Sequence, residues 1–387
     1  MCADRLKRFL LCLSVAVIAC GIPVTGARGQ AAGPVALGRA ERWHSNLLGD
    51  DRMIWIYTPD TARGSQTRYP VIYVVDGQAY YITTVAVTQF LVSNDLMPAM
   101  MVVGIENTAN RTRDLTPLPA DSASPGSGGA DAFLRAIREE LIPSIERRYH
   151  TAPYRTLIGH SFGGIFAVNA LLRQPSMFNS YVIASASLWW GRDTLVQQIR
   201  SFVHAPSTYR AAVYQTVGNE GSQMVTPTLD VMRDVEKNRV EGLDWKVRLL
   251  ENDDHGTTPL KTSYDGLEYI FRGWHFHGDI AVAGLHGLQE HYDSAAARCN
   301  LPAQIPEAVV NLLGYRYMGM NRMPEAIAAF RWNVEHYPAS WNVYDSLGEA
   351  YAKEGDTKLA IQSYEKSLML YPGSPSGVQA LKNLRGK

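Results

Sequence analysis

Short, nearly all-apolar runs alternate with longer stretches whose apolar residues recur at helical spacing from about residue 41 onward. The apolar runs predict strands that are buried on both faces, at residues 52–57, 71–75, 101–105, 155–158, 181–184, 211–217 and 246–250. Residues 131–149 and 162–172 carry the helical spacing and predict helices between these strands. A β, α, β, α order predicts an α/β fold with a mostly parallel central sheet.

The C-terminal part of the chain has a different pattern, because it repeats at an offset of 34 residues, the period of the tetratricopeptide helical hairpin. Small residues, aromatic residues and prolines recur in register: Leu313, Gly314, Tyr317, Ala326, Phe330 and Pro338 match Leu347, Gly348, Tyr351, Ala360, Tyr364 and Pro372. We therefore expect an α/β domain over residues 34–278, a connecting helix within 279–305, and a small all-α domain over 306–387. That last domain would hold two tetratricopeptide repeats and a capping helix.

The first residues resemble an export signal. Three basic residues precede an apolar run at residues 9–19, which is too short to span a bilayer but has the length of a secretory signal core. Cleavage after Ala27 would remove a signal peptide of residues 1–27. Alternatively, residues 17–20 resemble a lipobox, so that a lipoprotein signal of residues 1–19 would be removed and Cys20 would carry a lipid anchor. Both alternatives predict an exported protein, either periplasmic or secreted.

Charge and cysteine content narrow the classes of function. The 387 residues include 37 basic and 37 acidic side chains, and cleavage after Ala27 removes three basic and one acidic residue, leaving a net charge of −2. This balance argues against a nucleic-acid partner. Of the four cysteines, three lie in the first twenty residues and only Cys299 lies in the body of the chain, so no disulfide framework is expected.

The candidate chemistry centres on Gly159-His160-Ser161-Phe162-Gly163, which lies between a predicted strand and a predicted helix. A G-x-S-x-G sequence in that context predicts a nucleophile elbow, in which Ser161 is exposed above the sheet edge. The N–H of Phe162, at the start of the helix, would stabilise a developing oxyanion. We expect a second donor from the N–H of Gln78, in the turn after the strand at residues 71–75.

A nucleophilic serine needs a base and an acid, which in this architecture follow later strands in the order Ser, Asp or Glu, His. His255 follows the strand at residues 246–250 in a polar turn and is the predicted base. Glu220 follows the strand at residues 211–217 and is the predicted acid, with Asp230 as the alternative.

The surroundings of the predicted site include aromatic and basic residues. Tyr80, Tyr81, Trp189 and Trp190 follow predicted strands near the same sheet edge, so we expect Tyr80, Trp189 and Trp190 to contact substrate. Arg111 and Arg113 suit either an anionic part of the substrate or an ion pair with Asp114 that pins their loop. His275 and His277 are spaced as strand ligands of zinc could be, but no nearby carboxylate or cysteine completes a set. We expect no metal and no cofactor.

Several stretches of the sequence, VVDGQAYY, ENTANRTRDLTP, LIGHSFGG, SASLWW and ENDDHG, resemble the putative esterase family of α/β-hydrolases. This family is related to esterase D, enterobactin-type siderophore esterases, feruloyl esterases and mycobacterial mycolyltransferases. The resemblance covers roughly residues 40–274, and members with tetratricopeptide tails resemble the chain to its C-terminus. It implies an α/β-hydrolase fold, Ser161 as nucleophile, His255 as base, and an acid at Glu220, where many relatives carry aspartate. It also implies carboxylic esters as the substrate class.

Three hypotheses follow from the sequence. The first is an exported serine esterase that hydrolyses a small-molecule ester through a Ser-His-Glu triad and an acyl-enzyme. The second is an acyltransferase of the mycolyltransferase type, which passes the acyl group to an alcohol. The third is a protein-binding module, in which the tetratricopeptide repeats hold a protein partner and the hydrolase scaffold is inactive.

Overall fold

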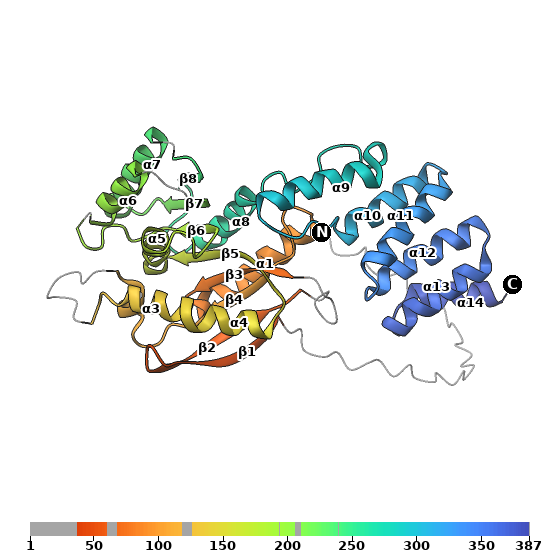
Figure 1. Ribbon diagram of the computed structural model, residues 1–387, viewed down its shortest axis with the longest axis horizontal. Coiled ribbons are helices and arrows are strands. Elements are labelled where there is room, and N and C mark those ends of the chain that lie inside the picture. Colours follow the sequence, from red (N-terminus) through yellow and green to blue (C-terminus); the bar gives the residue numbers. More distant parts are fainter. Residues whose placement is uncertain are drawn as a thin grey trace, which may run out of the picture. The chain divides into compact units, whose positions relative to one another are not determined.

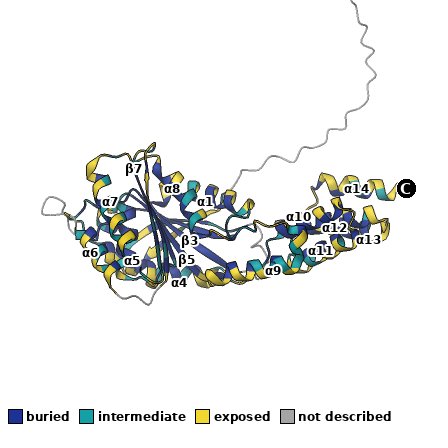
Figure 2. Ribbon diagram, turned by 90° about the horizontal axis from the view of Figure 1, so that it is seen from above, coloured by how far each residue is buried: buried dark blue, intermediate teal, exposed yellow. Residues whose placement is uncertain are grey.

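The computed structural model of the protein describes residues 37–59, 68–117, 126–192, 194–205, 210–238 and 240–386. The predicted signal segment, with Cys20, lies outside these ranges. Within them, a central sheet is covered by helices on both faces and is followed by a run of helices to the C-terminus (Figures 1 and 2). Among these described helices, none has the length and apolar character needed to cross a membrane.

The sheet has eight strands in the spatial order β1-β2-β4-β3-β5-β6-β7-β8. The strands are β1 (Arg39–Ser45), β2 (Asp50–Tyr57), β3 (Tyr69–Val75), β4 (Met101–Ile105), β5 (Thr151–His160), β6 (Ser180–Ala184), β7 (Ala211–Gly218) and β8 (Leu243–Leu250). β1 pairs antiparallel with β2 and β2 pairs antiparallel with β4, whereas the other neighbouring pairs are parallel. The predicted mostly parallel sheet is confirmed.

The edge strand β1 was not predicted from the sequence. Its seven residues, RAERWHS, bury only Trp43 and Ser45, and the other side chains are exposed or half-buried. An edge strand with one partner can carry polar residues at most positions, so it lacks the apolar run that marked the central strands.

The described helices occupy the connections between strands and the C-terminal region. They are α1 (Gly77–Ser93), α2 (Arg111–Leu115), α3 (Ala130–Ala136), α4 (Ile142–Arg148), α5 (Phe162–Arg173), α6 (Thr194–His204), α7 (Ser222–Lys237), α8 (Thr258–Ile270), α9 (Ile280–Arg298), α10 (Glu307–Gly319), α11 (Met323–His336), α12 (Trp341–Glu354), α13 (Thr357–Leu370) and α14 (Pro375–Arg385). The predicted helix at residues 131–149 is interrupted by a π-helical turn at Ile137–Leu141. This turn ends two residues before Pro143, which has no N–H to donate to the preceding turn of helix.

The sheet separates two hydrophobic clusters, because successive strand residues point to opposite faces. On β3, Tyr73 faces a cluster formed with α3 to α7, whereas Ile72 and Val74 face a cluster formed with α1, α8 and α9. The second cluster continues into α10 to α13. The hydroxyl of Tyr292 on α9 also donates to Asp95 Oδ2, 2.5 Å away at the end of α1. The C-terminal helices therefore share a continuous core with the α/β domain.

The C-terminal helices pack as two successive hairpins, α10 with α11 and α12 with α13. In the first hairpin, a Cβ added to Gly314 would lie 2.5 Å from the ring of Phe330, and in the second, one added to Gly348 would lie 3.1 Å from the ring of Tyr364. These four residues are related by the 34-residue offset. In each hairpin the missing side chain lets an aromatic ring pack directly against the neighbouring helix.

Gly314→Ala should lower the free energy of unfolding by about 1–3 kcal/mol, because the added methyl group overpacks the fully buried Phe330. Gly319→Ala is a matched control in the same helix, since nothing lies within 4 Å of its Cβ position. That variant should change the free energy of unfolding by no more than about 0.5 kcal/mol. Chemical denaturation measures both values, and equal losses in the two variants would contradict this account of the hairpin.

Candidate active site

The predicted nucleophile lies in a very tight turn between β5 and α5. Ser161 has φ 59° and ψ −116°, a conformation that side-chain-bearing residues rarely adopt. The turn brings Gly159 against Gly163 so closely that a Cβ on Gly159 would overlap the Gly163 carbonyl. The N–H of Ser161 donates to the carbonyl of Ala184 at the end of β6, 3.1 Å away. This turn holds the serine side chain at the carboxyl edge of the sheet.

Ser161, His255 and Glu220 form one hydrogen-bonded chain. Ser161 Oγ lies 3.0 Å from His255 Nε2, and His255 Nδ1 lies 2.5 Å from Glu220 Oε2. Because a carboxylate accepts, Nδ1 of a neutral His255 carries the hydrogen, which leaves Nε2 to accept from the serine. Asp230, the alternative acid, lies on α7 and pairs with Arg233, with 3.1 Å between Oδ1 and Nη2.

The carboxylate of Glu220 is held by several donors. Its side chain is only 4% exposed, and its second oxygen, Oε1, accepts from the N–H of Gly218 at 2.8 Å and from the hydroxyl of Ser185. A buried carboxylate with donors on both oxygens is fixed in orientation. By contrast, 44% of the His255 side chain is exposed, so the imidazole of the predicted base is accessible from solvent.

The two predicted oxyanion donors lie at the starts of two helices. Gly164 and Ile165 donate their N–H groups to the Ser161 carbonyl, so the N–H of Phe162 belongs to the first, unpaired turn of α5. Gln78 is the second residue of α1 and follows Asp76, which has φ 56°. Both positions have the positive end of a helix dipole behind them.

Arg111 connects these two helix starts. Its Nε and Nη2 atoms pair with the two oxygens of Asp76 at 2.7 and 2.9 Å, and its guanidinium lies 5.4 Å from the centroid of the Phe162 ring. Asn107 also donates to Asp76, and its N–H donates to Gln78 Oε1 at 3.2 Å. The turn that carries Gln78 is therefore braced by an ion pair whose arginine also contacts Phe162.

The predicted aromatic residues divide between the surface and the core. The rings of Phe162 and Trp190 lie 5.0 Å apart, and those of Trp189 and Trp190 lie 5.9 Å apart. Trp190 is buried, whereas Trp189 is half-buried and its Nε1 points to Met224 Sδ at 3.1 Å. Trp189 is thus the more accessible of the two tryptophans beside the elbow.

Arg113, also predicted to contact substrate, is engaged inside the protein. Its Nε lies 2.7 Å from Asp114 Oδ1 and its Nη2 lies 3.3 Å from Asp50 Oδ2. The same two carboxylates pair with the fully buried Arg52. The charge of Arg113 is therefore satisfied by carboxylates, including the ion pair with Asp114 that the sequence analysis gave as one alternative. These contacts give no support to a contact between Arg113 and substrate.

Sequence reasoning missed two residues that contact the hydrogen-bonded chain of Ser161, His255 and Glu220. His160 is buried, with Nδ1 2.8 Å from the hydroxyl of Tyr80 and Nε2 2.7 Å from the carbonyl oxygen of His255. Ser187 is also buried, and its Oγ lies 3.2 Å from Ser161 Oγ. The sequence signals were present: His160 precedes the nucleophile, and Ser187 lies in the SASLWW stretch. Neither sequence position shows which way the side chain points.

Burial, together with the smaller effect of the neighbouring His255, lowers the pKa of His160 from 6.5 to about 4. The two imidazole rings lie 4.4 Å apart. His160 is therefore neutral at physiological pH and places no second positive charge beside the predicted base.

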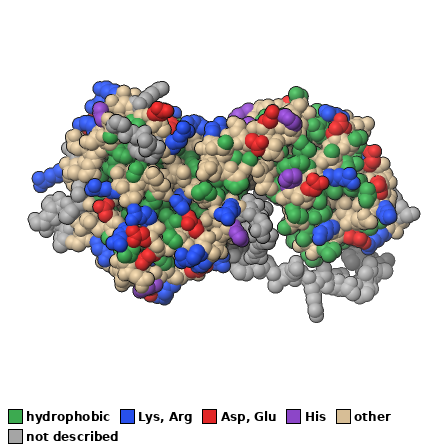
Figure 3. Space-filling model, in the orientation of Figure 1, with side chains coloured by type: hydrophobic (Ala, Val, Ile, Leu, Met, Phe, Trp, Pro, Cys, Tyr) green, Lys and Arg blue, Asp and Glu red, His purple; other side chains and the backbone are tan. Residues whose placement is uncertain are grey.

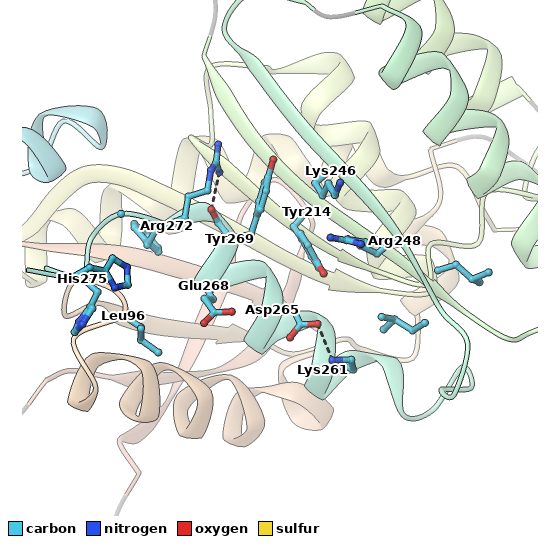
Figure 4. A pocket seen from close by; sticks show the side chains of 15 residues that line it. Leu96, Tyr214, Lys246, Arg248, Lys261, Asp265, Glu268, Tyr269, Arg272 and His275 are labelled. Atoms are coloured by element: carbon cyan, nitrogen blue, oxygen red, sulfur yellow. Dashed lines mark hydrogen bonds and ion pairs between the residues drawn. The ribbon is translucent and has the colours of Figure 1, made fainter.

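Other features of the described residues do not form a second reaction centre. A cleft of about 810 Å³ contains none of the predicted catalytic residues. Its lining includes Tyr214, Lys246 and Arg248 from β7 and β8 and Asp265 and Glu268 from α8 (Figure 4). Basic and acidic side chains are interspersed on the face in Figure 3. Within the described ranges, no group of three or more His, Cys, Asp or Glu side chains could hold a metal ion.

Comparison with known proteins finds relatives that are described as esterases. The siderophore triacetylfusarinine C esterase of Aspergillus fumigatus is 31% identical over 188 residues, which are 44% of this chain and 63% of that protein. The ferri-bacillibactin esterase BesA of Bacillus subtilis is 32% identical over 154 residues, which are 35% of this chain and 53% of that protein. The chain thus spans less than two thirds of the length of these relatives.

A solved structure extends the comparison to the fold. The crystal structure of an IroE-like serine hydrolase from Shewanella oneidensis matches 77% of this chain and 99% of its own chain, with a TM-score of 0.68 and 24% identity. The family described as Putative esterase matches residues 45–273, more than half of the chain, and this range includes Ser161, Glu220 and His255. The chain therefore belongs to the putative esterase family and has its α/β-hydrolase fold.

Proposed function

We propose that the protein is an exported serine esterase that hydrolyses small-molecule carboxylic esters. The observation that carries this proposal is the hydrogen-bonded chain from Ser161 Oγ through His255 to the buried Glu220. Each member has the residue type and the contact that its role requires: a nucleophile, a base and an orienting anion.

The reaction begins with transfer of the Ser161 proton to His255 Nε2 as Oγ attacks the ester carbonyl carbon. The N–H groups of Phe162 and Gln78 stabilise the negative charge that develops on the carbonyl oxygen. Glu220 stabilises the imidazolium, which then donates its proton to the departing alcohol. Water adds to the resulting acyl-serine with His255 again as base, and the acid leaves as Ser161 regains its proton.

The names of the relatives suggest which esters to examine first. Two proteins similar to this chain are described as esterases of siderophores. We propose ester-linked siderophores and other small carboxylic esters as substrates, reached through the exposed side of His255 and bordered by Trp189. Turnover by the purified protein, compared across siderophore, feruloyl, acetylated-sugar and simple acyl esters, tests the substrate class. Product analysis with added alcohols distinguishes hydrolysis from acyl transfer.

We also propose that α10 to α14 are two tetratricopeptide repeats with a capping helix, which could hold a protein partner. The matched glycine and aromatic pairs in the two hairpins support this assignment. An inactive scaffold that serves only for binding is the less favoured alternative, since it would have no need for a complete Ser-His-Glu hydrogen-bond chain. Export, by a signal peptide of residues 1–27 or a lipoprotein signal ending before Cys20, belongs to the same proposal.

Ser161→Ala should abolish turnover of a chromogenic short-chain ester, with a fall in kcat of at least about 10⁴-fold, because no other group replaces the nucleophile. The same variant should lose covalent labelling by a fluorophosphonate probe, which mass spectrometry locates on Ser161 in the wild type. Undiminished ester turnover in the alanine variant would refute the proposed function.

Glu220→Gln should lower kcat by about 10³- to 10⁴-fold, because a neutral amide neither fixes the tautomer of His255 nor stabilises its charged form. Asp230→Asn is the matched control, since this second candidate acid pairs with Arg233 on α7. Its kcat should stay within about twofold of wild type. Steady-state kinetics of both variants decide between the two carboxylates, and a large loss in the control alone would reassign the acid.

A further inference from the structure

His160 joins three elements of the proposed active site. It is the last residue of β5 and the neighbour of Ser161, it receives a hydrogen bond from Tyr80 on α1, and it contacts the backbone of His255. The proposed esterase mechanism gives it no chemical role. Its side chain is nevertheless buried and fully engaged, which suggests a function in holding the site together.

The direction of each hydrogen bond follows from the partners. The carbonyl oxygen of His255 can only accept, so Nε2 of His160 carries the hydrogen and donates it. In a neutral imidazole, Nδ1 is then an acceptor, and the hydroxyl of Tyr80 must be its donor. A pKa lowered to about 4 by burial agrees with this neutral form. Tyr80 thus fixes the tautomer that allows His160 to bond His255.

The loop that connects β8 to α8 carries His255, but most of its hydrogen bonds involve Asp253 and Asp254. The carbonyl of Asp253 accepts from the N–H of Asn219 at 2.7 Å. Asp254 Oδ1 accepts from two N–H groups of its own turn. The carbonyl of His255 has a tight bond to His160 at 2.7 Å and a long one to Thr258 Oγ1 at 3.4 Å. The bond from His160 therefore ties the predicted base to the turn that carries the nucleophile.

We propose that His160 is a positioning residue, which holds the backbone of His255 to the nucleophile elbow through its Nε2–H while Tyr80 holds its tautomer. This inference rests on the proposed esterase function, because it concerns the geometry of the Ser161–His255 pair. Displacing a catalytic base by about 1 Å can lower the reaction rate about a hundredfold. A single hydrogen bond that fixes the position of His255 therefore has a large effect on kcat.

Two substitutions of His160 separate the hydrogen bond from simple packing. His160→Gln places an amide N–H near the position of Nε2, so it keeps a donor to the His255 carbonyl. His160→Asn ends at the level of Nδ1 and cannot reach that carbonyl. We expect kcat to fall about 10- to 100-fold in His160→Asn and to stay within about threefold of wild type in His160→Gln, with KM unchanged in both.

His291→Asn is the matched control for this pair. Its Nε2 makes the same kind of bond, to the carbonyl of Trp274 at 2.7 Å, but on α9. We expect this variant to keep the wild-type kcat, whatever its effect on thermal unfolding.

Tyr80→Phe tests the second half of the inference without altering His160. The loss of one neutral donor should lower kcat by about two- to tenfold at unchanged KM, because the imidazole is free to adopt the other tautomer. Tyr269→Phe is the control, since this half-buried hydroxyl donates to Asp244 at 2.7 Å, away from Ser161. That control should keep the wild-type kcat. The tyrosine pair still decides the question if His160→Asn does not fold.

Failure of the positioning role and failure of the esterase proposal give different results. If the wild-type protein turns over no ester, the esterase proposal fails, and the positioning role that rests on it fails with it. If the wild type is active and folded His160→Gln and His160→Asn lose activity equally, or if the loss appears only in KM, the positioning role is overturned. An unchanged kcat in Tyr80→Phe would overturn the role of the tyrosine.

The pH dependence of the free energy of unfolding tests separately whether His160 is neutral in the folded protein. Since its pKa is lowered from 6.5 to about 4 in the folded protein, the unfolded state binds a proton between these values that the folded state does not. The wild type should therefore lose free energy of unfolding as the pH falls from 6.5 to 4, and His160→Gln should lose less over the same range. Equal losses would mean that His160 is not held neutral in the folded protein, which would contradict the assigned donation from Tyr80 to Nδ1.

Discussion

The tight turn at Ser161 is the constraint on which the rest of the site depends. The close approach of Gly159 and Gly163 forces the serine into its unusual backbone conformation and starts α5 immediately behind it. One geometric requirement thus provides a raised hydroxyl and an unpaired helix N-terminus within two residues. The residue before the serine, His160, meets Tyr80 and the His255 loop.

The parallel sheet supplies the other groups. Gln78, Ser161, Glu220 and His255 follow β3, β5, β7 and β8, and the carboxyl ends of parallel strands lie along one edge. Two groups separated by 94 residues, Ser161 and His255, come within hydrogen-bond distance in this way. The rigidity of the site derives from these paired strands, while its chemistry derives from the loops that follow them.

Ion pairs with buried carboxylates fix the neighbouring loops. Asp76 holds Arg111 at the turn before Gln78, and Asp114 holds Arg52 and Arg113. Breaking such a pair leaves an uncompensated buried charge, which is strongly destabilising. The hydrophobic cluster on the α1 and α8 face extends into the C-terminal helices, so those helices also support the scaffold of the site.

The sequence by itself determined the central strands and the elbow, and it predicted Ser161, Glu220 and His255 in their order along the chain, because apolar runs and closely spaced glycines are local features. It predicted Glu220 ahead of Asp230 from position after a strand alone. Tertiary structure decided the polar edge strand β1, the engagement of Arg113 by Asp50, and the contacts of His160 and Ser187. The side-chain contacts among these depend on which way a side chain points and on partners 26 to 95 residues away, which no local pattern records.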